Sequence, residues 1–220
     1  MLRAPPKPLA AGNPLALATR GDPRKALEAR VRSLTEAGRH EQAAGEVLRT
    51  LGPEVLGYLR SMMRSDADGD EVFASVSARV WRGLAKFEWR CSLRTWAYLL
   101  AHREMARFRQ QGRRHEEGRV PISEIGSIVA EVRSTTTGRS ALREKLAKLR
   151  EELPQEDQAL LVLRVDRDLE WDEIALIFAK KVDGSRDADT KREAARLRKR
   201  FQIIKERLAK RFREEGLTSD

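Results

Sequence analysis

Residues 169–212 read LEWDEIALIFAKKVDGSRDADTKREAARLRKRFQIIKERLAKRF, a short apolar helical pattern followed by a polar turn and a long basic pattern. In the long pattern, apolar residues recur at the spacing of one helix face. They are Leu197, Phe201, Ile204 and Leu208. Thr190 followed by Glu193 fits a capping box that begins this helix. The stretch therefore predicts a helix-turn-helix, with a turn longer than the usual length of roughly three or four residues.

The long helix is basic on the face opposite this apolar stripe. The segments before it, 151–158 and 165–173, are rich in acid, whereas residues 191–213 are overwhelmingly basic. A solvated helix face normally mixes the two signs, so the separation favours a surface that contacts an anion. In a helix-turn-helix, the second helix enters the major groove, where Arg, Lys and Gln reach bases and phosphates. The candidate DNA-binding residues are Arg192, Arg196, Arg198, Lys199, Gln202 and Lys205, with Arg207 as a further phosphate contact.

The composition of the chain favours a polyanionic partner. Of its 220 residues, 35% are charged, and the formal net charge of +10 indicates nucleic acid first and an anionic membrane surface second. Cys91 is the single cysteine, which excludes an internal disulfide and a zinc site built from several thiolates. No apolar run approaches the roughly 20 residues of a membrane span, and the N-terminus lacks the apolar core of a signal peptide. We therefore expect a cytoplasmic protein.

Helical periodicity extends along the chain, and no sustained strand-like alternation interrupts it. The sequence therefore predicts an all-α protein of two helical bundles joined by a flexible linker. The predicted parts are a disordered leader at 1–24, a first bundle at 25–115, a linker at 116–138, a second bundle at 139–214 and a tail at 215–220. Within the linker, ISEIGSIVAEV (122–132) is apolar enough to dock as a short helix.

The sequence contains no familiar catalytic pattern. The three histidines, His40, His102 and His115, are scattered, and HExxH, GxSxG, paired cysteines and a phosphate-binding glycine loop are missing. Most carboxylates stand beside Arg or Lys, as in solvated ion pairs. We expect no enzyme activity, no catalytic residue, no metal site and no cofactor.

The stretch LPQEDQALLVLRVDRDLEWDEIALIF, residues 153–178, resembles the opening of region 4 in bacterial RNA polymerase sigma factors of the extracytoplasmic-function type. The matching residues are Leu153, Pro154, Leu161, Leu163, Arg164, Glu173, Ile174 and Ala175. The apolar spacing of the long basic helix is also similar to that of the family's recognition helix. This resemblance implies that the basic helix contacts the −35 promoter element.

Two upstream stretches resemble region 2 of the same family. SLRTWAYLLAHREMARFRQQGRR (92–114) matches through Arg94, Thr95, Trp96, Tyr98, Ala101, Arg113 and Arg114. DGDEVFASVSARVWRGLAKF (68–87) is similar to the acidic helix that docks on the polymerase clamp. The resemblance implies −10 contacts by Phe87, Trp89, Arg90, His102, Arg109 and Arg113. It implies polymerase contacts by Asp66, Asp70, Glu71 and Trp81.

The residues themselves support part of this assignment. Phe87 and Trp89 stand beside Arg90 in a connector, and exposed aromatic side chains beside arginine grip unpaired bases. His102 and Arg109 point away from the apolar stripe of their helix, which suits strand contact. The acidic residues at 66–71 also suit the start of a helix, where carboxylates meet the positive end of the dipole.

Together, the resemblance implies a sigma factor that binds core RNA polymerase, helps to melt the −10 element and anchors on the −35 element. It also implies regulation by a cognate anti-sigma factor. The chain departs from the family at Ala74, at the His102–Arg103 pair and in the turn insertion at 181–190. Two alternatives stay open. One is a sigma-derived helix-turn-helix regulator that no longer binds polymerase, and the other is a non-specific binder of nucleic acid or of a membrane surface.

Overall fold

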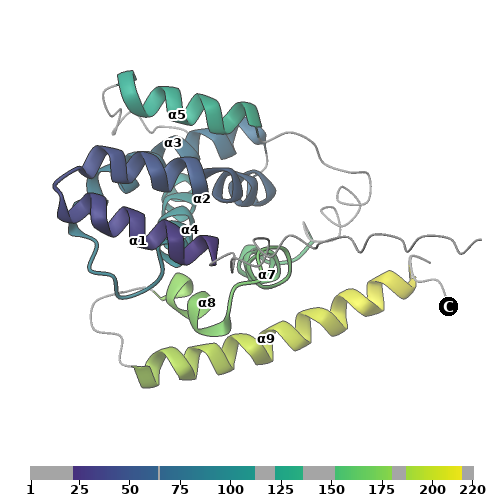
Figure 1. Ribbon diagram of the computed structural model, residues 1–220. Helices are drawn as coiled ribbons and strands as arrows, with labels where there is room; N and C mark the ends of the chain where they lie inside the picture. Colours follow the sequence, from purple (N-terminus) through teal and green to yellow (C-terminus); the bar gives the residue numbers. More distant parts are fainter. Residues whose placement is uncertain (1–21, 64, 112–121, 136–151, 180–186, 215–220) are drawn as a thin grey trace, which may run out of the picture.

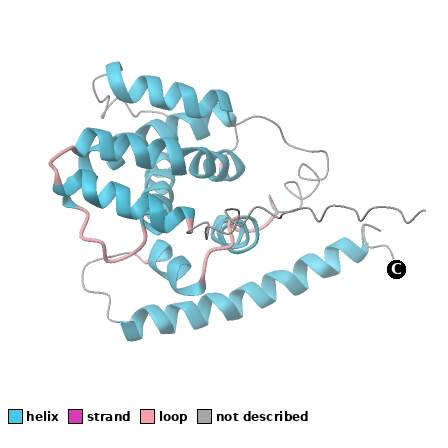
Figure 2. Cartoon of the chain, in the orientation of Figure 1, coloured by secondary structure: helices cyan, strands magenta, loops and turns pink. Residues whose placement is uncertain are grey.

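All regular secondary structure in the described part of the chain is helical, which confirms the all-α prediction (Figures 1 and 2). The computed structural model describes residues 22–63, 65–111, 122–135, 152–179 and 187–214. Residues 1–21 of the predicted leader, most of the helix expected before Pro154 and the middle of the long turn lie outside these residues, and the first helix begins at Pro23, within the range predicted as leader. None of the described helices is long and apolar enough to cross a membrane.

Helix α2 (His40–Met62) is the centre of the first bundle and packs against α1 (Pro23–Glu36), α3 (Asp66–Gly83) and α4 (Leu93–Gln111). A short 3-10 turn, Leu84–Lys86, follows α3. The backbones of α2 and α3 approach closely at Gly69. A Cβ atom at this position would lie only 3.0 Å from the Arg60 Cα atom. Ser65 caps α3 by accepting a hydrogen bond from the Asp68 amide at 3.1 Å.

Helix α5 (Ile122–Thr135) lies over α2 and α3, at the top of the molecule in Figure 1. Its buried side chains are Ile128, Val129 and Val132. Arg133 also donates a hydrogen bond to the Asp70 carbonyl oxygen at 2.6 Å. The prediction that the apolar segment 122–132 docks as a helix is thus confirmed for its described side chains.

The C-terminal part contains α7 (Gln155–Leu161), a π-helical continuation at Val162–Asp166, α8 (Trp171–Phe178) and the long α9 (Asp187–Glu214). Figure 1 shows α9 running along the lower edge, below α8 and α7. The predicted stripe of α9 is confirmed, since Leu197, Phe201 and Ile204 are buried and Leu208 is half-buried.

The start of α9 differs from the prediction. The helix begins at Asp187, so Thr190 and Glu193 lie within it and do not form a capping box at its start. Asp187 and Asp189 occupy the first turn instead, where carboxylates meet the positive end of the helix dipole. Helix α8 does carry a capping box, between Glu170 and Glu173.

Candidate nucleic-acid and polymerase interface

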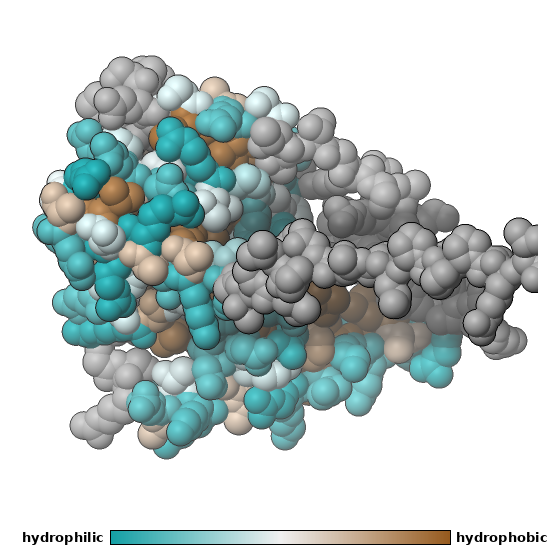
Figure 3. All heavy atoms as spheres, in the orientation of Figure 1, coloured by the Kyte–Doolittle hydropathy of each residue, from teal (hydrophilic) through white to brown (hydrophobic). Residues whose placement is uncertain are grey.

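The outer face of α9 is exposed and basic. All six candidate residues lie on it with exposed side chains, namely Arg192, Arg196, Arg198, Lys199, Gln202 and Lys205. Figure 3 shows hydrophilic side chains along this lower edge of the molecule. Arg196 is 3.6 Å from Glu193 with a side chain 75% exposed, and the Arg198 guanidinium lies 5.5 Å from the centre of the Trp171 ring. The face is therefore free to contact an anion, and its role in DNA binding stays a prediction.

One arginine of α9 forms ion pairs within the fold, a role that the sequence did not indicate. Arg200 points toward α7, where its guanidinium lies 2.5 Å from the Asp157 carboxylate and 2.8 Å from Glu156. Asp157 is buried, and the Arg200 cation compensates the cost of burying its negative charge. The acidic start of α7 was the available signal, but only the fold shows which basic residue meets it.

Aromatic side chains gather at the connector between α3 and α4. The Phe87 ring centre lies 4.8 Å from that of Trp96 and 5.0 Å from that of Trp89. Phe87 and Trp89 are half-buried, which corrects the expectation of an exposed pair. Trp89 has a positive φ of 58°, a strained conformation for a bulky residue that costs about 1–3 kcal/mol.

The guanidinium of Arg32 in α1 lies over the ring of the strained Trp89, 4.4 Å from the ring centre, in a cation–π contact. The sequence gives no sign of this role for Arg32, because the contact joins residues far apart in the chain. Arg90 is exposed, as expected, and pairs with Glu88 at 2.7 Å.

Two predicted −10 residues of α4 turn inward instead of outward. The His102 ring stacks on Phe178 of α8 at 4.9 Å between centres, and its Nδ1 is 3.4 Å from the Tyr58 hydroxyl. Arg109 donates a hydrogen bond to the Met62 carbonyl oxygen at 2.6 Å. The expectation that both face away from the packed side is wrong, because α8 and the end of α2 cover that side of α4. Arg113 lies outside the described residues.

The acidic residues expected to bind polymerase lie on the first turns of α3. Asp66 is exposed, and Glu71 and Trp81 are half-buried. Asp70 is engaged within the chain, at 2.8 Å from Arg60 and 3.6 Å from Arg133. Their placement at a helix start agrees with the sequence, and polymerase contact stays a prediction.

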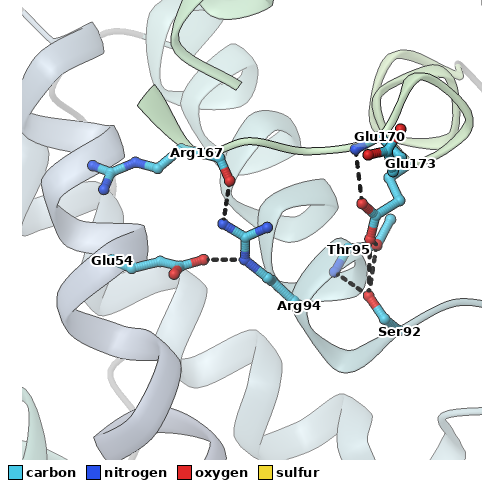
Figure 4. Close-up of polar contacts among 7 residues, drawn as sticks. All are labelled: Glu54, Ser92, Arg94, Thr95, Arg167, Glu170 and Glu173. Atoms are coloured by element: carbon cyan, nitrogen blue, oxygen red, sulfur yellow. Dashed lines mark hydrogen bonds and ion pairs between the residues drawn. The ribbon is translucent and has the colours of Figure 1, made fainter. Parts of the chain in front are cut away.

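Polar side chains join α4 to the C-terminal part (Figure 4). The buried Arg94 guanidinium donates to the Glu54 carboxylate of α2 and to the Arg167 carbonyl oxygen, both at 2.5 Å. The Thr95 hydroxyl donates to Glu173 Oε1 at 2.7 Å, and the Ser92 hydroxyl lies 3.3 Å from the same oxygen. Several residues that carry the sequence resemblance are therefore also contacts between the two halves.

Comparison with known proteins gives two matches. Residues 47–115 match the family model of sigma-70 region 2, a span that begins in α2 and extends just beyond α4. RNA polymerase sigma factor YlaC of Bacillus subtilis (strain 168) is 23% identical over 145 residues, which cover 64% of this chain and 82% of that protein. These matches confirm the resemblance to bacterial sigma factors that the sequence motifs indicated.

We predict that His102 makes stability depend on pH. Burial, helped by Arg109 and opposed by Glu156, lowers the pKa of the His102 imidazole from 6.5 to about 4. The unfolded chain therefore binds this proton more readily than the folded chain does. The stability that the neutral His102 contributes is fully present above about pH 6.5 and is lost as the pH falls toward 4. The expected loss between pH 7 and pH 5 is on the order of 2 kcal/mol.

Urea unfolding of the wild type, His102→Gln and His40→Gln at both pH values measures this effect. His102→Gln should lose most of the difference between the two pH values, whereas His40→Gln should keep it, because His40 is exposed. An equal pH dependence in all three proteins would contradict the prediction.

Proposed function

We propose that this chain, which matches the sigma-70 region 2 model over residues 47–115, is a sigma factor that binds core RNA polymerase and directs it to promoter DNA. The observation that carries the proposal is the presence on one chain of a region 2 match and an exposed basic helix behind a short capped helix. The activity is binding and positioning, not catalysis. Action on RNA polymerase would place the chain in the cytoplasm.

In this proposal, α9 contacts the −35 element. Its exposed Arg196, Lys199 and Gln202 can donate hydrogen bonds to base edges, and Lys205 can neutralise a phosphate. The apolar stripe holds the helix on α8, and Arg200 holds it on α7, so the basic face is presented by a fixed support.

The first bundle supplies the other two contacts. The aromatic group of Phe87, Trp89 and Trp96 offers ring faces for an unpaired base of the −10 element, once strand entry displaces its present packing. Asp66, Glu71 and Trp81 form the proposed polymerase contact, together with Asp70. A cognate anti-sigma factor would regulate the protein by covering these surfaces.

The strongest alternative is a DNA-binding regulator that no longer engages polymerase. Ala74, where the family usually has glutamine, is exposed on α3 among the acidic residues, and this departure motivates the alternative. Non-specific binding of nucleic acid is the second alternative. The two experiments below separate them from the sigma factor proposal.

The first experiment is assembly with core polymerase. Core enzyme lacking a sigma subunit should co-elute with the purified chain in size-exclusion chromatography. Glu71→Arg should weaken this complex by about tenfold, since it reverses a charge at the proposed contact. Glu41→Arg makes the same charge change on an exposed turn of α2 and should leave assembly intact. Failure of the wild type to co-elute would favour the DNA-binding regulator.

The second experiment measures duplex binding by fluorescence anisotropy across a range of salt concentrations. Arg196→Gln combined with Lys199→Gln should weaken binding to a promoter duplex by about tenfold or more and reduce the salt slope by about 1 to 2. Arg30→Gln with Arg49→Gln removes the same charge from exposed positions of α1 and α2, and should change little. Equal losses in both double variants would indicate non-specific attraction.

A further inference from the structure

We propose that Ile203, on the outer face of α9, is a specificity-determining residue that contacts the C5-methyl group of a thymine in the duplex element bound by this helix. The inference rests on the proposed function, because it takes α9 as the helix that enters the major groove. It adds an apolar contact to a helix whose other candidate contacts are all charged or polar.

Ile203 is exposed although its side chain is large and apolar. The residue is 52% exposed, and within the described part of the chain the exposed large hydrophobic residues are Ile203 and Val165. The next residue, Ile204, is buried, so the packed side of α9 ends beside Ile203. Single apolar residues are common on protein surfaces, and the surroundings of Ile203 decide what its exposure means.

Those surroundings are a stripe of cations. Residues three or four apart share one face of a helix, and at this spacing five exposed basic residues and one apolar residue follow each other along α9. In order, they are Arg192, Arg196, Lys199, Ile203, Arg207 and Lys210. Electrostatic attraction to an anion does not call for an apolar side chain in this row. The stripe therefore suits a partner that is anionic along its edges and apolar at one point between them.

The major groove of duplex DNA has this character. Phosphates line its two edges, and the C5-methyl group of thymine is the apolar group that a base pair presents on its floor. Covering that methyl group favours thymine by about fourfold. Isoleucine cannot form a hydrogen bond, so against the polar edge of another base it would displace water without replacing the lost bond. Both effects favour thymine opposite Ile203.

The support beneath Ile203 is fixed. Phe201 and Ile204 are buried on either side of it along the helix, and the Phe201 ring meets the Trp171 ring of α8 edge-on at 5.4 Å between centres. One turn earlier, Arg200 pairs with Asp157 of α7 at 2.5 Å. A β-branched side chain in a helix also keeps one main χ1 rotamer. The apolar group is therefore presented in a defined position, as the reading of one base requires.

Holoenzyme supplies the test. Core polymerase reconstituted with the chain selects duplexes from a randomised library, and sequencing gives the preferred bases. The preferences that disappear when Arg196→Gln is combined with Lys199→Gln mark the element contacted by α9. At least one thymine should be among them.

Each of these thymines is then replaced in turn by deoxyuridine, which keeps the pairing and the polar atoms but lacks the C5-methyl group. One replacement should weaken binding of the wild-type holoenzyme by about fourfold. Ile203→Ala should weaken binding to the thymine duplex by a similar factor and should no longer distinguish thymine from deoxyuridine. Ile203→Gln should shift the preferred base at the same pair toward adenine, which glutamine can bind through two hydrogen bonds.

Val165→Ala is the matched control, because it removes the other exposed large apolar side chain, which lies outside α9. It should keep the fourfold difference. Alanine and glutamine both favour helices, so the Ile203 variants should keep α9 folded, and circular dichroism checks this.

Three results would overturn the inference while leaving the sigma factor proposal in place. They are the absence of any deoxyuridine effect in the wild type, the same effect in Ile203→Ala, and a loss of core polymerase binding by Ile203→Ala, which would assign the residue to a protein contact. A wild-type holoenzyme that selects no sequence would instead contradict the proposed function itself, and this inference with it.

Discussion

The buried guanidinium of Arg94 is the interaction on which the arrangement of this protein depends. Only 6% of the residue is exposed, and a buried cation is tolerated when charged or polar partners surround it. Glu54 of α2 and the backbone of Arg167 supply those partners. One side chain therefore fixes α4 against α2 within the first bundle and also fixes the C-terminal part against both. Removing it would leave Glu54 without its cation at the junction.

This junction determines which of the proposed binding surfaces are exposed and which are covered. Its polar groups hold the α4 side of the first bundle against α8, whereas the basic face of α9 and, at the start of α3, Asp66 remain exposed. The proposed surface for duplex DNA on α9 is therefore accessible, whereas the His102 side of α4 is covered by α8.

Features set by local periodicity could be predicted from the sequence, and features set by distant partners could not. The apolar stripe of α9 and the docking of residues 122–132 follow from spacing alone. The inward placement of His102 does not, because it depends on Phe178, which is far away in the chain. Arg200 stands among other basic residues in the sequence, so its packing role cannot be told from their proposed binding role by residue type. The position of Asp157, which pairs with Arg200, makes the distinction.

Run-off transcription tests the central claim most directly. Core polymerase, the purified chain and a library of genomic fragments should yield transcripts that are absent with core enzyme alone. Their start sites should share a pair of upstream sequence elements at constant spacing, because both promoter contacts belong to one chain. Transcription that does not rise above the level of core polymerase alone would contradict the assignment as a sigma factor.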